Sequence, residues 1–165
     1  MTRVIGIDPG YGRLGWGVVD DNGDFPVFVH CGVIETPSSL PFSQRLKGIK
    51  AAVLKLLQDF HPDCVAVEKP VHGPNVTNSV EVGAAFGAVL LAGEEYALAF
   101  IRTYWPSEVK AAVLKGNAKK KEVQVQVALL LSLPKIPRPD DAADALAVAI
   151  CGANRYVVDG LEQVL

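Results

Sequence analysis

Short runs of β-branched apolar residues alternate along this chain with longer runs in which apolar residues recur every three or four positions. The short runs predict strands at residues 4–8, around 18–19, and at 27–35, 64–68 and 99–104. The longer runs predict helices at residues 42–60, from 77 or 78 to about 98, from 106, from a basic turn at 115–121 to 133, and from 140 or 141 to 153. The predicted order is therefore β-β-β-α-β-α-β-α-α-α.

The opening part of the chain predicts an antiparallel meander of three strands. Four glycines between residues 9 and 17 indicate a turn after the first strand. Asn22-Gly23 then separates two strand-like runs, which is a strong signal for a hairpin. No Gly-x-Gly-x-x-Gly pattern opens a helix here, so a dinucleotide-binding start is excluded.

Length and composition place limits on the class of protein. At 165 residues with 50% hydrophobic residues, we expect one globular domain spanning residues 1–165. No apolar run is long enough to span a membrane, so no membrane association is expected. Cys31, Cys64 and Cys151 stand in apolar surroundings without any Cys-x-x-Cys pair, which predicts buried thiols in the reducing cytoplasm rather than a zinc site.

Charge is unevenly distributed even though the net charge is only −2. Residues 59–95 hold six acids and one base, while residues 102–121 hold six bases and one acid. A basic stretch of this kind can bind phosphates whatever the total charge of the chain.

Two of the predicted strands end in an acid. Asp8 ends the first strand before Pro9-Gly10, and Glu68 ends the fourth strand shortly before Pro70. Asp8 by itself could simply initiate a turn. However, an acid at the tip of a buried strand loses solvation free energy unless a positive group meets it.

A second pair of acids opens the last predicted helix. One of Asp140 and Asp141 is expected to be an ordinary N-cap. Asp144 follows Asp141 by one helical turn, on the same face of an alanine-rich helix. Capping and solvation would explain this pair, but two like charges at that spacing also favour a cation between them.

Together, Asp8, Glu68, Asp141 and Asp144 make a candidate metal site. Carboxylate oxygens without histidine or cysteine suit Mg²⁺ or Mn²⁺ rather than zinc. Four carboxylates around two such ions are typical of a phosphodiester-cleaving site.

Several segments, taken in order, resemble the RuvC-type Holliday junction resolvases, which are crossover junction endodeoxyribonucleases of the ribonuclease H-like superfamily. Each motif is weak alone, but the ordered set is specific and covers nearly the whole chain. The segments are Ile5-Gly6-Ile7-Asp8-Pro9-Gly10, Gly15-Trp16-Gly17-Val18-Val19, Ala66-Val67-Glu68 and Asp141-Ala142-Ala143-Asp144-Ala145-Leu146-Ala147.

The resemblance implies an α/β, ribonuclease H-like fold. Its five-stranded mixed sheet, a three-strand antiparallel meander followed by parallel strands, would be flanked by helices. It also implies an endonuclease that resolves four-way junction DNA by paired symmetric nicks in recombination and repair. The cofactor would be Mg²⁺, two ions per subunit, with Mn²⁺ able to substitute. The partners would be a second copy in a homodimer and a RuvA–RuvB branch-migration complex.

Residue by residue, the resemblance assigns the four catalytic metal ligands to Asp8, Glu68, Asp141 and Asp144. Lys110 matches a family lysine near the site, and either Lys120 or Lys121 matches a second. The small residues Gly83, Ala84 and Gly87 match the helix that family members pack against its twofold mate. Close packing on the sheet would explain these small residues equally well.

The chain departs from the family pattern at two places. Where members carry an aromatic residue in the loop after the glutamate, this chain has Val71 and His72, so base stacking would fall to His72. Gly12 stands where a basic residue is common, and Arg13 beside it is the candidate replacement for DNA binding.

Three other readings remain open from the residues. One is a ribonuclease H-like nuclease acting on RNA or other structured nucleic acid. Another is a nucleotide binder of the sugar-kinase or actin type, which would need a second phosphate loop and about twice the length. The last is a non-catalytic junction-binding protein, which would lack one of the four acids.

Overall fold

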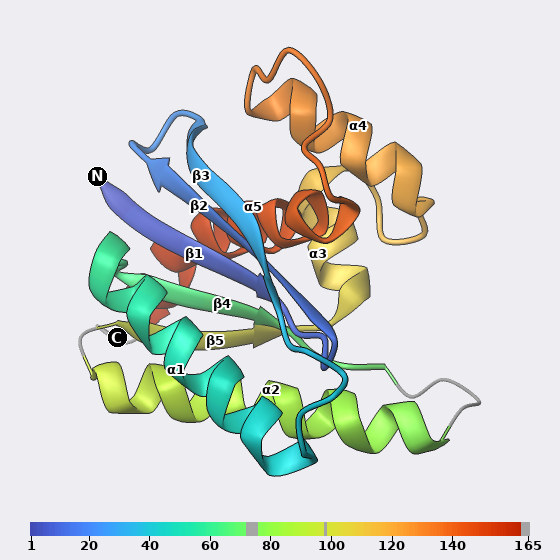
Figure 1. Cartoon of the computed structure of the whole chain (residues 1–165). Helices are drawn as coiled ribbons and strands as arrows, with labels where there is room; N and C mark the ends of the chain where they lie inside the picture. Colours follow the sequence, from blue (N-terminus) through green and yellow to red (C-terminus); the bar gives the residue numbers. More distant parts are fainter. Residues whose placement is uncertain (72–75, 98, 163–165) are drawn as a thin grey trace.

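The computed structural model describes the backbone of residues 1–71, 76–97 and 99–162, and the side chains of 1–71, 79–97 and 99–156. Its centre is a five-stranded sheet in the order β3-β2-β1-β4-β5 (Figure 1). The strands are β1 (Thr2–Asp8), β2 (Arg13–Asp21), β3 (Pro26–Glu35), β4 (Cys64–Glu68) and β5 (Phe100–Tyr104). The helices are α1 (Phe42–Phe60), α2 (Val76–Tyr96), α3 (Pro106–Val113), α4 (Lys120–Leu130) and α5 (Asp140–Glu162).

The first three strands form the predicted meander. β1 pairs with β2 and β2 pairs with β3, both antiparallel. Gly23 lies between β2 and β3 with a φ of +96°, a conformation that glycine adopts without steric cost. The Asn22-Gly23 signal therefore identified the hairpin correctly.

The other half of the sheet is parallel, as predicted. β4 pairs with β1, and β5 pairs with β4. The carboxyl ends of β1, β4 and β5 consequently lie along one edge of the sheet (Figure 1). The mixed sheet with flanking helices confirms the predicted fold class.

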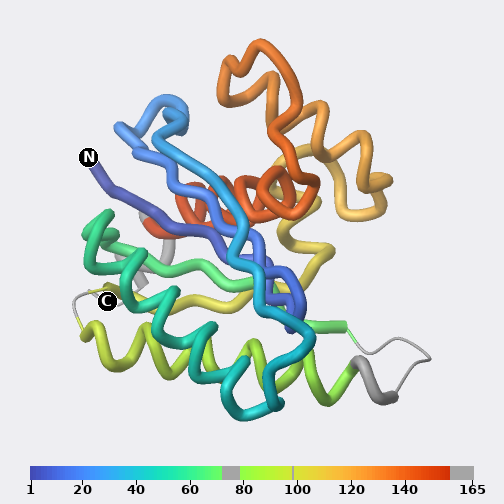
Figure 2. The backbone as a smooth tube through the Cα atoms, viewed as in Figure 1, coloured from blue at the N-terminus to red at the C-terminus, as the bar shows by residue number. Residues whose placement is uncertain are grey.

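Helices cover both faces of the sheet. Successive residues of a strand point to opposite faces, so the apolar residues of β1 are buried on both sides. Val4 packs in a core with residues of α3, α4 and α5, whereas Ile5 and Ile7 pack in a second core with residues of α1 and α2. The result is a three-layer α/β/α arrangement, and the tube in Figure 2 shows the last helix passing beside the first strands.

Helix α5 lies unusually close to the sheet. A Cβ atom at Gly6 would collide with the backbone of Ala145 and Ala149, and one at Gly15 would collide with the backbone of Asp141. Glycine at these two positions is what allows helix and strand backbones to touch. The four glycines predicted only a turn as far as residue 17, but β2 already begins at Arg13. This part of the prediction was wrong because two of the glycines lie within the strand, where they make room for the helix.

The predicted helix ends differ from the structure by a few residues. α2 ends at Tyr96 and α4 at Leu130, and each is followed within two residues by a positive φ, at Ala97 and Ser132. α5 continues to Glu162 rather than ending at residue 153. None of the helices in the described ranges combines the length and apolar character that a membrane span requires. Cys64 and Cys151 are buried thiols and Cys31 is half-buried.

The contact at Gly6 can be tested by adding one methyl group. Gly6→Ala should force α5 away from β1 and lower the free energy of unfolding by about 3 kcal/mol or more. Gly48→Ala is the matched control, because Gly48 lies on the exposed side of α1 with no atom near its Cβ position and should gain about 0.5–1 kcal/mol. Urea unfolding measures both, and equal stability of the two variants would contradict the close contact.

Candidate active site

The parallel pairing of β1 and β4 brings two acids together. Ile7 pairs with Val67, so Asp8 and Glu68, each the next residue along its strand, leave the sheet side by side. Both strands end there because Pro9 follows Asp8 and Pro70 follows Glu68 by two residues. The predicted strand ends at Asp8 and Glu68 are confirmed, and the pairing places both acids at one edge of the sheet.

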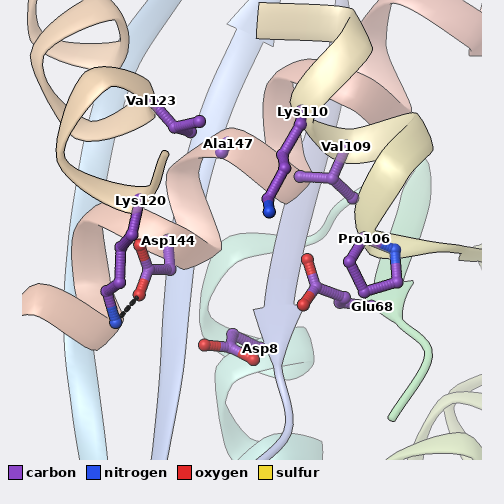
Figure 3. Close-up of a pocket in the computed structure, with 9 residues that line it drawn as sticks. All are labelled: Asp8, Glu68, Pro106, Val109, Lys110, Lys120, Val123, Asp144 and Ala147. Atoms are coloured by element: carbon purple, nitrogen blue, oxygen red, sulfur yellow. Dashed lines mark ion pairs between the residues drawn. The ribbon is translucent and has the colours of Figure 1, made fainter. Parts of the chain in front are cut away.

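Helix α5 brings Asp144 to the same edge. Asp8, Glu68 and Asp144 line one pocket of about 280 Å³, which we call the central pocket. Pro106, Val109 and Lys110 of α3, Lys120 and Val123 of α4 and Ala147 of α5 complete its lining. Figure 3 shows the carboxylates of Asp8 and Glu68 and the ammonium of Lys110 facing the same space.

The two strand-end acids hold their protons more tightly than usual. Burial, followed by the negative charges of Asp144 and Asp141, raises the pKa of Asp8 to about 6. Burial, followed by the charges of Asp8 and Asp144, raises the pKa of Glu68 to about 7. Such shifts show that burial, and secondly the neighbouring carboxylates, outweigh the local cations at these two acids, and shifts of this kind are common at functional sites.

Asp144 is held by two side chains of α4. Lys120 Nζ lies 2.6 Å from Asp144 Oδ2, and Gln124 Nε2 donates a hydrogen bond to Asp144 Oδ1 at 3.0 Å. The hydrogen bond to Asp144 raises the pKa of Lys120. Lys120, not Lys121, lines the central pocket, so the structure distinguishes two lysines that the sequence could not.

Gln124 is a site residue that the sequence analysis missed. Its side chain is buried, with only 6% of it exposed. It shares the buried face of α4 with Val123, Val127 and Ala128. No local signal could have identified it, because only the fold shows which face of α4 is buried and that a buried amide there needs a hydrogen-bond partner.

Asp141 lies beside the central pocket rather than within its lining. It lines a neighbouring recess together with Arg13, Lys120, Arg138, Pro139 and Asp140. Arg13 Nη2 lies 3.4 Å from Asp141 Oδ2, and Arg13 Nε lies 3.4 Å from Glu35 Oε1. Lys120 belongs to both cavities and links them.

The remaining predicted residues that the structure describes are not among those that line the central pocket. Lys121 is exposed and contributes to neither cavity. His72 lies outside the described residues, while its neighbour Val71 is exposed. Asp140 is the first residue of α5 rather than its N-cap, and its carboxylate accepts a hydrogen bond from Arg138 at 2.7 Å.

The oxygen atoms of the four predicted acids suit a hard divalent cation. Their carboxylates, however, are not arranged around one ion position. Throughout residues 1–71, 76–97 and 99–162, no group of three or more His, Cys, Asp and Glu side chains is placed to hold one metal ion. Lys120 and Arg13 instead neutralise Asp144 and Asp141. All four acids offer only oxygen, which Mg²⁺ and Mn²⁺ prefer.

The order and direction of the strands define the class of fold. A mixed sheet with three antiparallel strands followed by two parallel ones, flanked by helices on both faces, is the ribonuclease H-like fold of junction resolvases. The solved yeast mitochondrial Holliday junction resolvase Ydc2 shares this fold with a TM-score of 0.69 at 13% identity, over 99% of this chain and 86% of that chain.

Closer relatives identify the family. The family described as crossover junction endodeoxyribonuclease RuvC matches residues 4–152. RuvC of Thermotoga petrophila is 45% identical over 152 residues, covering 92% of both chains. The solved structure of RuvC from T. thermophilus in complex with a Holliday junction substrate matches with a TM-score of 0.85 at 36% identity, over 94% of this chain and 96% of that one. The chain belongs to the RuvC family of crossover junction endodeoxyribonucleases.

The raised pKa of Asp8 predicts a pH-dependent stability. The folded state binds the Asp8 proton more tightly than the unfolded chain, so stability falls as the pH rises from about 4 through the folded pKa of about 6. Asp8→Asn removes this penalty and should raise the free energy of unfolding at pH 8 by up to about 3 kcal/mol, with little effect at pH 4. Urea unfolding in EDTA at both pH values measures the difference. An equal effect at both pH values would show that the pKa of Asp8 is not raised in the folded state.

Proposed function

We propose that this chain is a metal-dependent endonuclease that cuts four-way (Holliday) DNA junctions. The observation that carries the proposal is the set of acids from β1, β4 and α5 at one sheet edge, flanked by Lys110 and Lys120. RuvC from T. thermophilus, which has the same fold, has been solved in complex with a Holliday junction substrate. The chain is proposed to act as one nuclease domain spanning residues 1–165.

The proposed ligands of the metal are Asp8, Glu68, Asp141 and Asp144. We infer Mg²⁺ as the physiological ion, with two ions per subunit and Mn²⁺ able to substitute, because the donor set is made of oxygen alone. Bound ions of this kind supply activation of the attacking water and stabilisation of the leaving oxyanion.

The chain's own cations and amides would prepare the site. Lys110 and Lys120 face the pocket where the DNA phosphate would lie, and Arg13 extends this positive charge on the side of Asp141. Gln124 orients the carboxylate of Asp144 through its hydrogen bond. A hydrogen bond to a charged oxygen is geometrically specific, so Gln124 is proposed as a positioning residue.

A homodimer would place two such sites on a junction and make paired nicks. Gly83 and Gly87 on α2 meet no atom within 4 Å at their Cβ positions. Val80 and Leu91 on the same helix are 64% and 62% exposed. This small and apolar face supports the proposal that α2 packs against its twofold mate. A RuvA–RuvB complex is proposed as a further partner from family membership alone.

The proposal is tested by comparing substrates. In Mg²⁺, the protein should cut a synthetic four-way junction and leave a linear duplex and an RNA–DNA hybrid largely intact. Preferred cleavage of the hybrid would favour a ribonuclease instead, and tight binding without cleavage would favour a junction-binding protein.

The four acids should be essential for cleavage. Asp8→Asn, Glu68→Gln, Asp141→Asn and Asp144→Asn should each lower the single-turnover rate at least about a hundredfold, because a metal site that loses a charged ligand loses several kcal/mol of transition-state stabilisation. Junction binding, measured by gel shift, should survive.

Asp140→Asn is the matched control for these variants. Its carboxylate pairs with Arg138 and lies outside the central pocket, so most of the activity should remain. If Asp140→Asn were as inactive as Asp141→Asn, the assignment of the ligand would be wrong.

Lys120 and Lys121 should differ in function. Lys120→Ala removes the cation that reaches Asp144 and should lower the cleavage rate at saturating junction. Lys121→Ala should leave that rate unchanged and at most reduce the slope of log affinity against log salt by about 0.9, the value for one phosphate contact on duplex DNA. Cleavage and binding at about 50 to 200 mM salt, a range over which phosphate contacts lose much of their affinity, measure both effects. The reverse pattern would assign the pocket lysine to Lys121.

A further inference from the structure

An exposed tryptophan stands next to the central pocket without a part in the site described above. Trp105 follows directly on β5, whose last residue, Tyr104, pairs with Glu68. Its side chain is 52% exposed. Tryptophan combines a large apolar ring with a polar N–H group, and at this position the half-exposed ring is available to a ligand beside a polar pocket.

A lysine accompanies the ring. Lys69 Nζ lies 4.7 Å from the centroid of Trp105, which is a cation–π contact. The backbone N–H of Lys69 donates to the carbonyl oxygen of Tyr104 at 2.8 Å, so the ends of β4 and β5 are tied together at this point. The ring and the positive charge therefore leave the sheet edge as one unit.

The backbone fixes the position of this unit. The N–H of Trp105 donates to Glu108 Oε2 at 2.8 Å, and the carbonyl oxygen of Trp105 accepts from the N–H groups of Glu108 and Val109 at 2.9 and 3.1 Å. The next residue, Pro106, begins α3 and lines the central pocket. These bonds involve no atom of the indole, so the ring can be replaced without disturbing the local fold.

We propose that Trp105, supported by Lys69, is a stacking platform for a nucleobase of the junction close to the cleaved phosphodiester. Every base presents a π-face to an aromatic ring, and the ammonium of Lys69 complements the adjoining phosphate. Lys110 and Lys120 continue the positive charge into the pocket. This inference rests on the proposed junction cleavage, and DNA is favoured over a protein partner because Lys69 contacts the ring and the next residue, Pro106, lines the pocket that also holds Lys110 and Lys120.

A matched control is available at the opposite end of the sheet. Phe25 is 72% exposed and lies between β2 and β3. β2 is antiparallel to β1 and its last residue, Asp21, pairs with Thr2, so this turn lies at the end of the sheet away from Asp8. Loss of an exposed aromatic ring as such can therefore be compared with loss of this particular ring.

The first experiment measures junction affinity in EDTA by fluorescence anisotropy. Trp105→Ala should bind a four-way junction about five- to a hundredfold more weakly, the range expected for one base–aromatic stack. Trp105→Phe should retain most of the affinity, and Phe25→Ala all of it. Urea unfolding of the same proteins confirms that stability is unchanged.

The second experiment reports on the ring itself. The chain has two tryptophans, so Trp16→Phe leaves Trp105 as the single emitter. Stacking on a base should quench its emission when the junction binds, and a linear duplex should quench it less.

The outcomes separate the two proposals. Wild-type affinity in Trp105→Ala, or unchanged Trp105 emission in the bound complex, overturns the stacking platform while junction cleavage by the wild-type protein stands. If the wild-type protein neither binds nor cuts the junction, the proposed function fails and the platform fails with it.

Discussion

The backbone contact between the start of α5 and the paired strands β1 and β2 is the constraint on which the proposed site depends. Gly15 is the register partner of Asp8, and its missing side chain leaves room for the backbone of Asp141. Acids from the two ends of the chain are thereby held close by backbone packing rather than by flexible side chains. Rigid placement of this kind is what a site needs when its ligands must stay close against their own repulsion.

The repulsion between these acids lowers the stability of the folded state at this edge. The pKa values of Asp8 and Glu68 are raised because both acids are largely withdrawn from water and lie near other carboxylates. Lys120 and Arg13 offset part of this cost by pairing with Asp144 and Asp141. The two cores on either face of the sheet supply the stability that allows such a strained edge to persist.

Local patterns predicted the sheet, and they predicted the acids of the candidate site that the fold brings to one edge. Prolines after Asp8 and Glu68 marked the strand ends, and the parallel pairing then placed both acids at one edge. Three features depended on tertiary contacts and were out of reach. The choice of Lys120 over Lys121 is set by how α4 rotates against α5. The role of Gly15 is visible only once a helix lies on it. From the sequence alone, Gln124 would be expected on a solvated face, and only the structure shows that it lies on the buried face of α4.

The close contact of α5 with β1 also determines when, during synthesis and folding, the site can form. The site joins the first strand to the last helix, so almost the whole sequence must be made before its acids can meet. Contacts between residues so far apart in the chain close late and slowly, because a large loop must be ordered first. A nascent or partly folded copy therefore carries separate carboxylates and no assembled nuclease site. Cutting activity would begin only when folding is complete.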